Sequence, residues 1–231
     1  MIFLCLDTSM AACAVAIMDG NAALSKMVEP MARGQSERLV PMIDGAMGAA
    51  GIAYTDLDFI AAGCGPGAYT GIRIALSAAR ALALGADIPV LGVPTTEILA
   101  AQFLVDHRPM PDGYVLPLID TKRGDVYGQV FGHDGQPRSA IFCGGADDVK
   151  THLSGLSGPL HIIGDGASLY PLDDIAGVER HGGYKLIDPV VMGTYAEGLV
   201  SDSGIASVAA KYPPRPLYIR DADVSTPKNA V

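Results

Sequence analysis

The chain has 231 residues, of which 49% are hydrophobic and 18% are charged. This composition argues against a disordered chain, because so many apolar side chains can offset the entropy lost on folding, and the length fits one large domain or two small ones. A total of 16 Lys and Arg against 25 Asp and Glu gives a net charge of −9, which argues against this chain alone binding a nucleic-acid backbone.

The first third of the chain predicts three short strands that form an antiparallel meander. β-rich apolar runs occupy 2–6, 13–18 and 23–28. The pair Asp19-Gly20 lies between the second and third runs and is a typical hairpin turn. The first strand stops at a polar triplet, which is discussed below.

A helix is expected next, from Ser36 to Gly51. Ser36 is a suitable N-cap, and Glu37 places negative charge in the first turn, where the helix dipole favours it. Three apolar residues recur at the spacing of one helix face; they are Leu39, Ile43 and Met47.

Strands and helices then alternate. We expect a buried strand at 58–64, a glycine-rich loop at 65–71, a helix at 72–84, a strand at 89–93 and a helix that opens at Thr95. A meander followed by alternating units predicts an α/β fold with a mixed sheet and helices on its faces.

The second half repeats this order more weakly. Strands are expected at 114–119, 126–132, 139–143 and 160–164, and helices at 145–153 and 190–200. Both halves begin with a strand followed by Asp-Thr and a hairpin, which indicates an internally duplicated fold. A linker at 106–113 separates two expected lobes, 1–105 and 106–231, and the Pro-rich tail from Tyr212 is expected to be extended and to pack back on the first lobe.

Asp7-Thr8-Ser9 directly follows the first strand. A carboxylate at the end of a central strand, with hydroxyls in the following turn, can hold Mg²⁺ and nucleotide phosphate, and Asp120-Thr121 is its counterpart in the second half. The alternative is that Asp7 only caps a turn through nearby backbone N–H groups. The triplet alone does not decide between the two.

The loop 65–71 joins a strand to a helix N-terminus, where free N–H groups favour anions. It matches neither GxxxxGK[ST] nor GxGxxG, and it holds no lysine. The position of the loop would allow Gly65 and Gly67 to line a phosphate site. Because the known phosphate-binding motifs are absent, backbone geometry and close packing explain the glycines better.

The helix after this loop is rich in alanine and places Arg73, Ser77 and Arg80 on one face. Arginine is enriched at protein interfaces. This face is interpreted either as a partner surface or as the solvated edge of a core helix.

No catalytic constellation is visible in the sequence. There is no GxSxG motif, and the five histidines are not paired at metal-ligand spacing; they are His107, His133, His152, His161 and His181. Each is expected to be structural or exposed, and no metal is expected.

The cysteines and the N-terminus favour a cytoplasmic protein. Cys5, Cys13, Cys64 and Cys143 form no CxxC motif, so we expect buried free thiols in a reducing compartment. The apolar N-terminus reaches Asp7 too soon for a signal peptide, and no run reaches the roughly 18 apolar residues of a spanning helix.

Seven motifs in order resemble the TsaB (YeaZ) family over nearly the whole chain. They are DTS at 7–9, QSERL at 35–39, GPGAYTGIR at 65–73, GVPTT at 92–96, DTKRGDVY at 120–127, GDG at 164–166 and PLYIR at 216–220. The GPGxxTGxR block after a strand is the most specific of these.

The resemblance implies two lobes of the actin/Hsp70/sugar-kinase (ASKHA) type, each with a ribonuclease-H-like core. It implies a role in making N6-threonylcarbamoyladenosine (t6A) at position 37 of tRNAs that read ANN codons. TsaB-like proteins are not the transferase: they pair with TsaD, which binds metal and transfers the threonylcarbamoyl group from an adenylate made by TsaC-type enzymes. The ATPase TsaE joins the assembly. TsaB-like proteins also self-associate through the helices that meet TsaD, and tRNA contact is expected to be indirect.

Two positions matter for this expectation. TsaD-like chains carry His-x-x-x-His just after the strand that corresponds to 90–93, and the matching residues here are Thr95 and Leu99. Leucine cannot replace imidazole as a ligand, which disfavours a metal-dependent transferase. The family often has His where this chain has Gln35, so an imidazole role there is not expected.

The sequence therefore predicts a non-catalytic partner of TsaD. Its partner and dimer interface is expected to combine an apolar centre with arginine anchors, formed by Leu39, Ile43, Met47, Arg73, Ser77 and Arg80. No cofactor of its own is expected. ATP or ADP in the cleft or at the partner interface would use Asp7, Thr8, Ser9, Gly65, Gly67 and Asp120. The alternative is a small actin-fold ATPase or kinase that uses Asp7 and Asp120.

Overall fold

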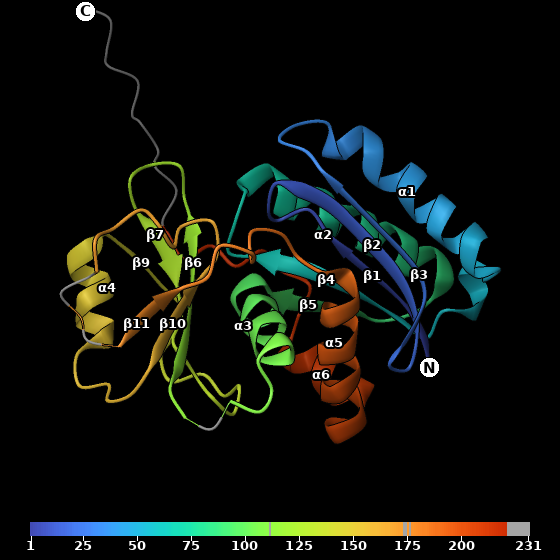
Figure 1. Cartoon of the computed structure of the whole chain (residues 1–231). Coiled ribbons are helices and arrows are strands. Elements are labelled where there is room, and N and C mark those ends of the chain that lie inside the picture. The colour runs from blue at the N-terminus through green and yellow to red at the C-terminus, as the bar shows by residue number, and fades with distance from the viewer. Residues whose placement is uncertain (111, 173–174, 176, 221–231) are drawn as a thin grey trace, which may run out of the picture.

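Two β-sheets, one from each half of the chain, lie side by side in the computed structural model, which describes residues 1–110, 112–172, 175 and 177–220 (Figure 1). The first sheet has the strand order β3-β2-β1-β4-β5. Its strands are β1 (Ile2–Asp7), β2 (Ala12–Asp19), β3 (Ala22–Pro30), β4 (Phe59–Gly65) and β5 (Val90–Pro94). The antiparallel meander of the first three strands is confirmed.

Helices cover both faces of the first sheet (Figure 1). One face carries α1 (Gln35–Ala50) and α2 (Tyr69–Ala86), with the short 3₁₀ helix η1 (Tyr54–Asp56) beside α2. The other face carries α3 (Thr95–Asp106), α5 (Pro189–Ser203) and α6 (Ile205–Lys211). The central strand β1 is therefore buried on both sides, and its sequence IFLCLD is apolar at consecutive positions instead of alternating.

The second sheet has the order β11-β10-β6-β7-β9, with β8 paired to β6 outside this path. Its strands are β6 (Tyr114–Asp120), β7 (Val126–Gly128), β8 (Phe131–Gly132), β9 (Phe142–Gly144), β10 (Leu160–Ile163) and β11 (Val178–Arg180), and α4 (Ala146–Leu153) packs on it. The segment expected to be one strand at 126–132 is thus two short strands, and the strand expected at 139–143 begins only at Phe142.

The two sheets have the same topology. In the first half, β1 pairs antiparallel with β2 and parallel with β4. In the second half, β6 pairs in the same way, antiparallel with β7 and parallel with β10. The outer strands follow the same rule: β3 and β9 are antiparallel edges, and β5 and β11 are parallel edges. The duplication indicated by the repeated strand-Asp-Thr pattern is confirmed.

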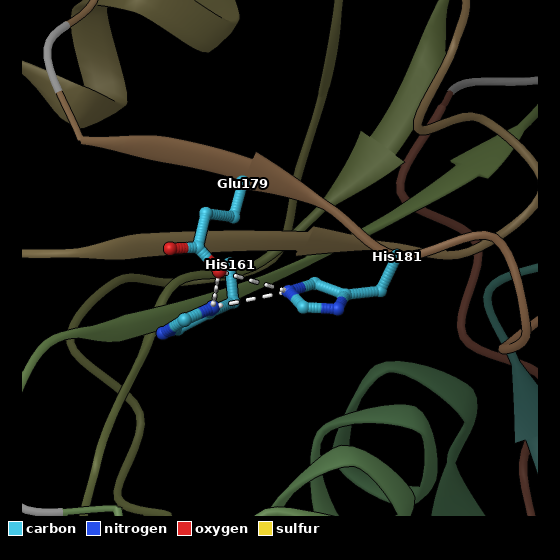
Figure 2. Close-up of side chains that lie close together, drawn as sticks. All are labelled: His161, Glu179 and His181. Carbon is cyan, nitrogen blue, oxygen red and sulfur yellow. Dashed lines mark hydrogen bonds and ion pairs between the residues drawn. The ribbon is translucent and has the colours of Figure 1, made fainter.

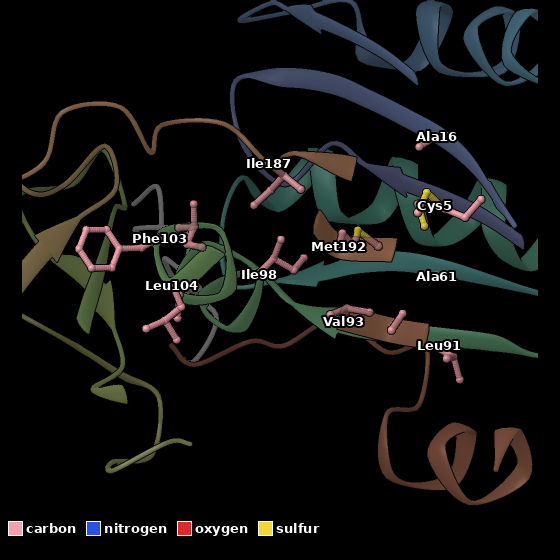
Figure 3. Close-up of a cluster of buried hydrophobic side chains, with 14 of the residues drawn as sticks. Cys5, Ala16, Ala61, Leu91, Val93, Ile98, Phe103, Leu104, Ile187 and Met192 are labelled. Carbon is pink, nitrogen blue, oxygen red and sulfur yellow. The ribbon is translucent and has the colours of Figure 1, made fainter. Parts of the chain in front are cut away.

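Two helices, α3 and α5, connect the two halves. α3 follows β5 and contacts β6 of the second sheet as well as β4 and β5 of its own sheet, and α5 follows β11 but packs on β1, β2 and β3 of the first sheet. One apolar cluster consequently runs through both halves, from Cys5 and Met192 to Phe103 (Figure 3). Two other clusters lie on the outer faces, one under α1 and α2 and one under α4.

Several element ends differ from the expectation. α1 begins at Gln35 with Gly34 as N-cap (φ 92°), so the Ser36 cap is wrong: the Ser36 hydroxyl donates to the Glu37 carboxylate instead. The Gln35 amide donates to the backbone oxygen of Met31. α2 begins at Tyr69, three residues before the expected start, and α6 was not expected.

The four cysteines are free thiols, and Cys143 is only partly buried, whereas the other three are buried as expected. Burial raises the pKa of Cys13 to about 11 and that of Cys64 to about 12, so both are protonated at neutral pH. In the described part of the chain, no helix is both long and apolar enough to cross a membrane.

The crossing of α5 can be tested at Gly193. A Cβ on Gly193 would lie 2.7 Å from the Met18 Cγ and 3.0 Å from the Cys5 Sγ, so Gly193→Ala is expected to destabilise the protein by about 1–3 kcal/mol in urea unfolding. Gly198 is the control, because it lies in the same helix with nothing within 4 Å of such a Cβ. Gly198→Ala is expected to be neutral or to stabilise by up to about 1 kcal/mol; equal effects of both changes would contradict the close approach.

Candidate functional site

The turn after β1 has most of its polar groups bonded within the chain. The Asp7 Oδ1 accepts from the backbone N–H of Ser9 (3.0 Å) and from its hydroxyl (3.1 Å). The Thr95 hydroxyl donates to the hydroxyl oxygen of Ser9 (3.0 Å), and the Thr8 hydroxyl donates to the backbone oxygen of Gly71 (2.6 Å). The turn is buried, with Asp7 only 2% exposed.

The glycine loop packs directly on this turn. A Cβ on Gly67 would lie 2.3 Å from the Ser9 carbonyl oxygen, and one on Gly71 would lie 1.9 Å from that of Thr8. The backbone N–H of Ala68 donates to the same Ser9 oxygen. Close packing therefore accounts for these two glycines, as the sequence favoured, and Gly65 (φ 97°) is needed for its backbone conformation.

Among the described residues, one oxygen of Asp7 finds no hydrogen-bond partner. The Oδ2 is buried and lies 1.8 Å from the point where a Cβ on Gly63 would sit. Burial raises the pKa of Asp7 to about 6, and the hydrogen bonds from Ser9 only partly oppose this. The carboxylate thus carries a desolvated charge at neutral pH.

The second half has an equivalent turn after β6. The backbone N–H of Lys122 donates to Asp120 Oδ1 (2.7 Å), as that of Ser9 does to Asp7. The Lys122 ammonium also binds Asp120 (2.8 Å) and Asp165 (3.1 Å). Burial alone would raise the pKa of Asp120, but the hydrogen bonds from Lys122 outweigh it and lower the pKa. The two turns occupy equivalent sheet edges; nucleotide binding between them stays a prediction.

The expected apolar centre of the partner interface is wrong. Leu39, Ile43 and Met47 point into the core under α1 and α2, where each is at most 4% exposed. Their helical spacing identified an apolar face correctly, but that face covers the first sheet. These residues cannot reach a partner in the folded chain.

The arginine face of α2 is exposed, as the interface hypothesis requires. Arg73, Ser77 and Arg80 all lie on the solvent side of the helix. Two apolar residues extend the same stripe at helical spacing: Tyr69 is 57% exposed and Leu84 is 85% exposed. We call these five residues the α2 stripe.

The C-terminal tail runs along the α2 stripe from Tyr69 to Arg80. Arg73 lies over the ring of Tyr69 (3.8 Å) and donates to the Tyr218 hydroxyl (2.7 Å), and the two tyrosine rings stack at 5.5 Å. Arg80 donates to the backbone oxygen of Pro214. The tail runs without helix or strand over 212–219, as expected.

A pocket of about 460 Å³ lies between this tail and β4, β5 and α3. Glu97 of α3 lines it and accepts a hydrogen bond from Tyr195 (2.7 Å). Burial raises the pKa of Glu97. No sequence pattern indicates this pocket, because its walls come from segments far apart in the chain.

The histidines are less isolated than their spacing suggested. His161 of β10 and His181, just after β11, lie within hydrogen-bond distance of each other (3.1 Å). Sequence spacing does not reveal this pair, because 20 residues separate the two histidines and only the parallel pairing of β10 with β11 brings them together.

Comparison with known proteins supports one family. The sequence model of TsaD, tRNA N6-adenosine threonylcarbamoyltransferase, matches residues 28–159. The tRNA threonylcarbamoyladenosine biosynthesis protein TsaB of Escherichia coli K12 is 29% identical, over 94% of each chain.

Two solved structures support the fold. YeaZ from Pseudomonas aeruginosa superposes with a TM-score of 0.76 at 26% identity, covering 94% of this chain and 99% of that one. The activator of the 2-hydroxyisocaproyl-CoA dehydratase from Clostridium difficile, solved with bound ADPNP, gives 0.50 at 10% identity, covering 88% and 97%. The expected two-lobed actin-like fold is confirmed.

The charge on Asp7 makes stability depend on pH. Its pKa is about 6 in the folded protein against an ordinary value of 3.8, so the folded state holds more protons between these values and stability falls as pH rises through them. In Asp7→Asn this contribution is absent. The unfolding free energy of the variant relative to wild type is expected to rise by about 2 kcal/mol from pH 4 to pH 7 in urea titrations.

Asp202→Asn, at an exposed position on α5, is the control for Asp7→Asn. Its stability relative to wild type is expected to change little over the same pH range. A flat difference for Asp7→Asn as well would show that Asp7 is not desolvated.

Proposed function

The chain belongs to the TsaD family of tRNA N6-adenosine threonylcarbamoyltransferases, on its TsaB (YeaZ) branch, and we propose that it is a non-catalytic subunit in the formation of t6A at position 37 of ANN-reading tRNAs. Its proposed role is to bind TsaD and support threonylcarbamoyl transfer. A cytoplasmic location belongs to the same proposal.

The non-catalytic role is supported by the environment of Thr95 and Leu99. By the resemblance to TsaD-like chains, these two residues match the positions of their His-x-x-x-His metal ligands. Thr95 is buried, with its hydroxyl bonded to Ser9, and Leu99 is buried in the core cluster that joins the halves. Neither side chain offers a metal ligand of the imidazole type.

The partnership with TsaD is supported by shared ancestry and by an available surface. The TsaD model covers α1, α2 and the strands around them, and the α2 stripe is exposed on these elements. Apolar residues combined with arginines and a tyrosine are typical of interface hot spots. We propose the α2 stripe as the surface for TsaD and for self-association, and TsaE as a further member of the assembly.

The proposal includes no resident cofactor and only indirect tRNA contact, in keeping with the net charge of −9. ATP or ADP between the two Asp turns or at the partner interface is the ligand to test. The kinase alternative is not favoured, because the Thr8 and Ser9 hydroxyls are bonded internally and Asp120 is paired with Lys122.

Reconstitution tests the function directly. The chain would be combined with TsaD, TsaE and the TsaC-type enzyme of the same organism, with tRNA, threonine, bicarbonate and ATP, and t6A would be measured by nucleoside mass spectrometry. We expect product only when this chain is present, and no turnover by the chain alone. Equal product without the chain, or ATP turnover by the chain that Asp7→Ala abolishes, would contradict the proposal.

The α2 stripe is tested by reversing the charge of Arg73 and by placing a charge at the exposed Leu84. Leu84→Glu and Arg73→Glu are each expected to weaken TsaD binding and self-association at least tenfold, about 1.4 kcal/mol, measured by calorimetry and sedimentation. Leu169→Glu is the matched control, because Leu169 is exposed (41%) but lies in the other half. Unchanged binding in both stripe variants would assign the interface elsewhere.

A further inference from the structure

Three side chains with metal-binding groups meet on the parallel edge of the second sheet. His161 of β10 and Glu179 of β11 are direct register partners. His181 follows two residues after Glu179, so the strand alternation places it on the same face. Its backbone N–H donates to the Ile162 oxygen (2.9 Å), which continues the strand pairing and fixes its position.

The donor atoms of the three residues converge (Figure 2). The His161 Nδ1 lies 3.1 Å from the His181 Nε2 and 3.6 Å from the Glu179 Oε2, and the last two atoms are 3.8 Å apart. A point equidistant from the three atoms lies about 2.0 Å from each, which is the bond length of Zn²⁺ to imidazole nitrogen and carboxylate oxygen.

The rings are held in place before any ion arrives. Phe103 of α3 packs against both imidazoles, with ring centroids 5.1 Å from His161 and 4.8 Å from His181. His107, which follows the last residue of α3, contacts the His181 ring, with the ring centroids 5.3 Å apart. Support of this kind fixes ligand orientation and strengthens metal binding.

The cluster is open on one side. The imidazoles are 15% and 23% exposed, whereas Glu179 is 63% exposed. Solvent therefore reaches the carboxylate, and a water can complete a four-coordinate shell.

We propose that His161, Glu179 and His181 bind a divalent transition-metal ion, with Zn²⁺ the best match to two imidazoles and one carboxylate. Within the described residues, this is the one group of three or more such side chains close enough to share an ion. The ion would join β10 to β11 next to α3, the helix that comes from the other half of the chain. This site is independent of the proposed t6A function.

The test uses the untagged full chain after chelator treatment. Zn²⁺ binding would be measured by competition with a chromogenic chelator, and Co²⁺ would report the coordination through its visible absorption. We expect one ion per chain, the intense absorption of four-coordinate cobalt, and a higher melting temperature with Zn²⁺. Glu179→Gln is expected to weaken binding at least tenfold, and because Glu179 is largely exposed this variant should fold normally.

The double variant His161→Ala/His181→Ala is expected to lose the ion and the thermal shift. His133→Ala, which removes an exposed histidine from the same half, is the matched control and should bind as wild type does. If the double variant does not fold, Glu179→Gln and the cobalt spectrum decide. Substoichiometric binding by wild type, or equal affinity in wild type and Glu179→Gln, would overturn the proposal and leave a hydrogen-bonded histidine pair.

Discussion

The packing of α3 and α5 between the two halves is the constraint on which the rest of the structure depends. Without a helix from the other half, the sheet of each half would have part of its inner face uncovered. α3 and α5 solve this reciprocally, because each packs on elements of the other half and together they close one apolar cluster. The hydrophobic effect therefore favours the two halves only when they are packed together. The residues at their junction are consequently held in fixed positions.

The fixed junction explains how a desolvated carboxylate persists in the first half. Asp7 lies at the end of a strand buried on both faces, Gly63 leaves the space its carboxylate needs, and Thr95 of the crossing helix extends the hydrogen bonds through Ser9. The equivalent Asp120 lies in a more open edge, where Lys122 neutralises it. The same turn therefore occurs once in each half, but the pKa of the two aspartates shifts in opposite directions. Burial raises the pKa of Asp7, and the hydrogen bonds from Lys122 lower that of Asp120.

Local patterns predicted the meander, the glycine loop, the duplication and the exposed arginines of α2, because each depends on residues close together in the chain. The core position of Leu39, Ile43 and Met47 was misassigned, since periodicity identifies an apolar face but not what covers it. α6 is only seven residues long, too short for periodicity to detect. The pairing of His161 with His181 depends on strand register between segments 20 residues apart, which no local pattern contains.

The C-terminal tail links the α2 stripe to the second half of the chain. Tyr218 contacts Arg73 and Tyr69 of the α2 stripe, and two residues later Arg220 forms an ion pair with Asp125 of the second half (2.8 Å). A partner that binds the α2 stripe must therefore either include the Tyr218 ring in its contact or displace it. Displacement of the Tyr218 ring would free Arg73 and weaken the link between the tail and the second half. If the ring stays in place, the tail becomes part of the interface. The metal cluster lies on β10 and β11 in the second half, so its occupancy is separable from either outcome.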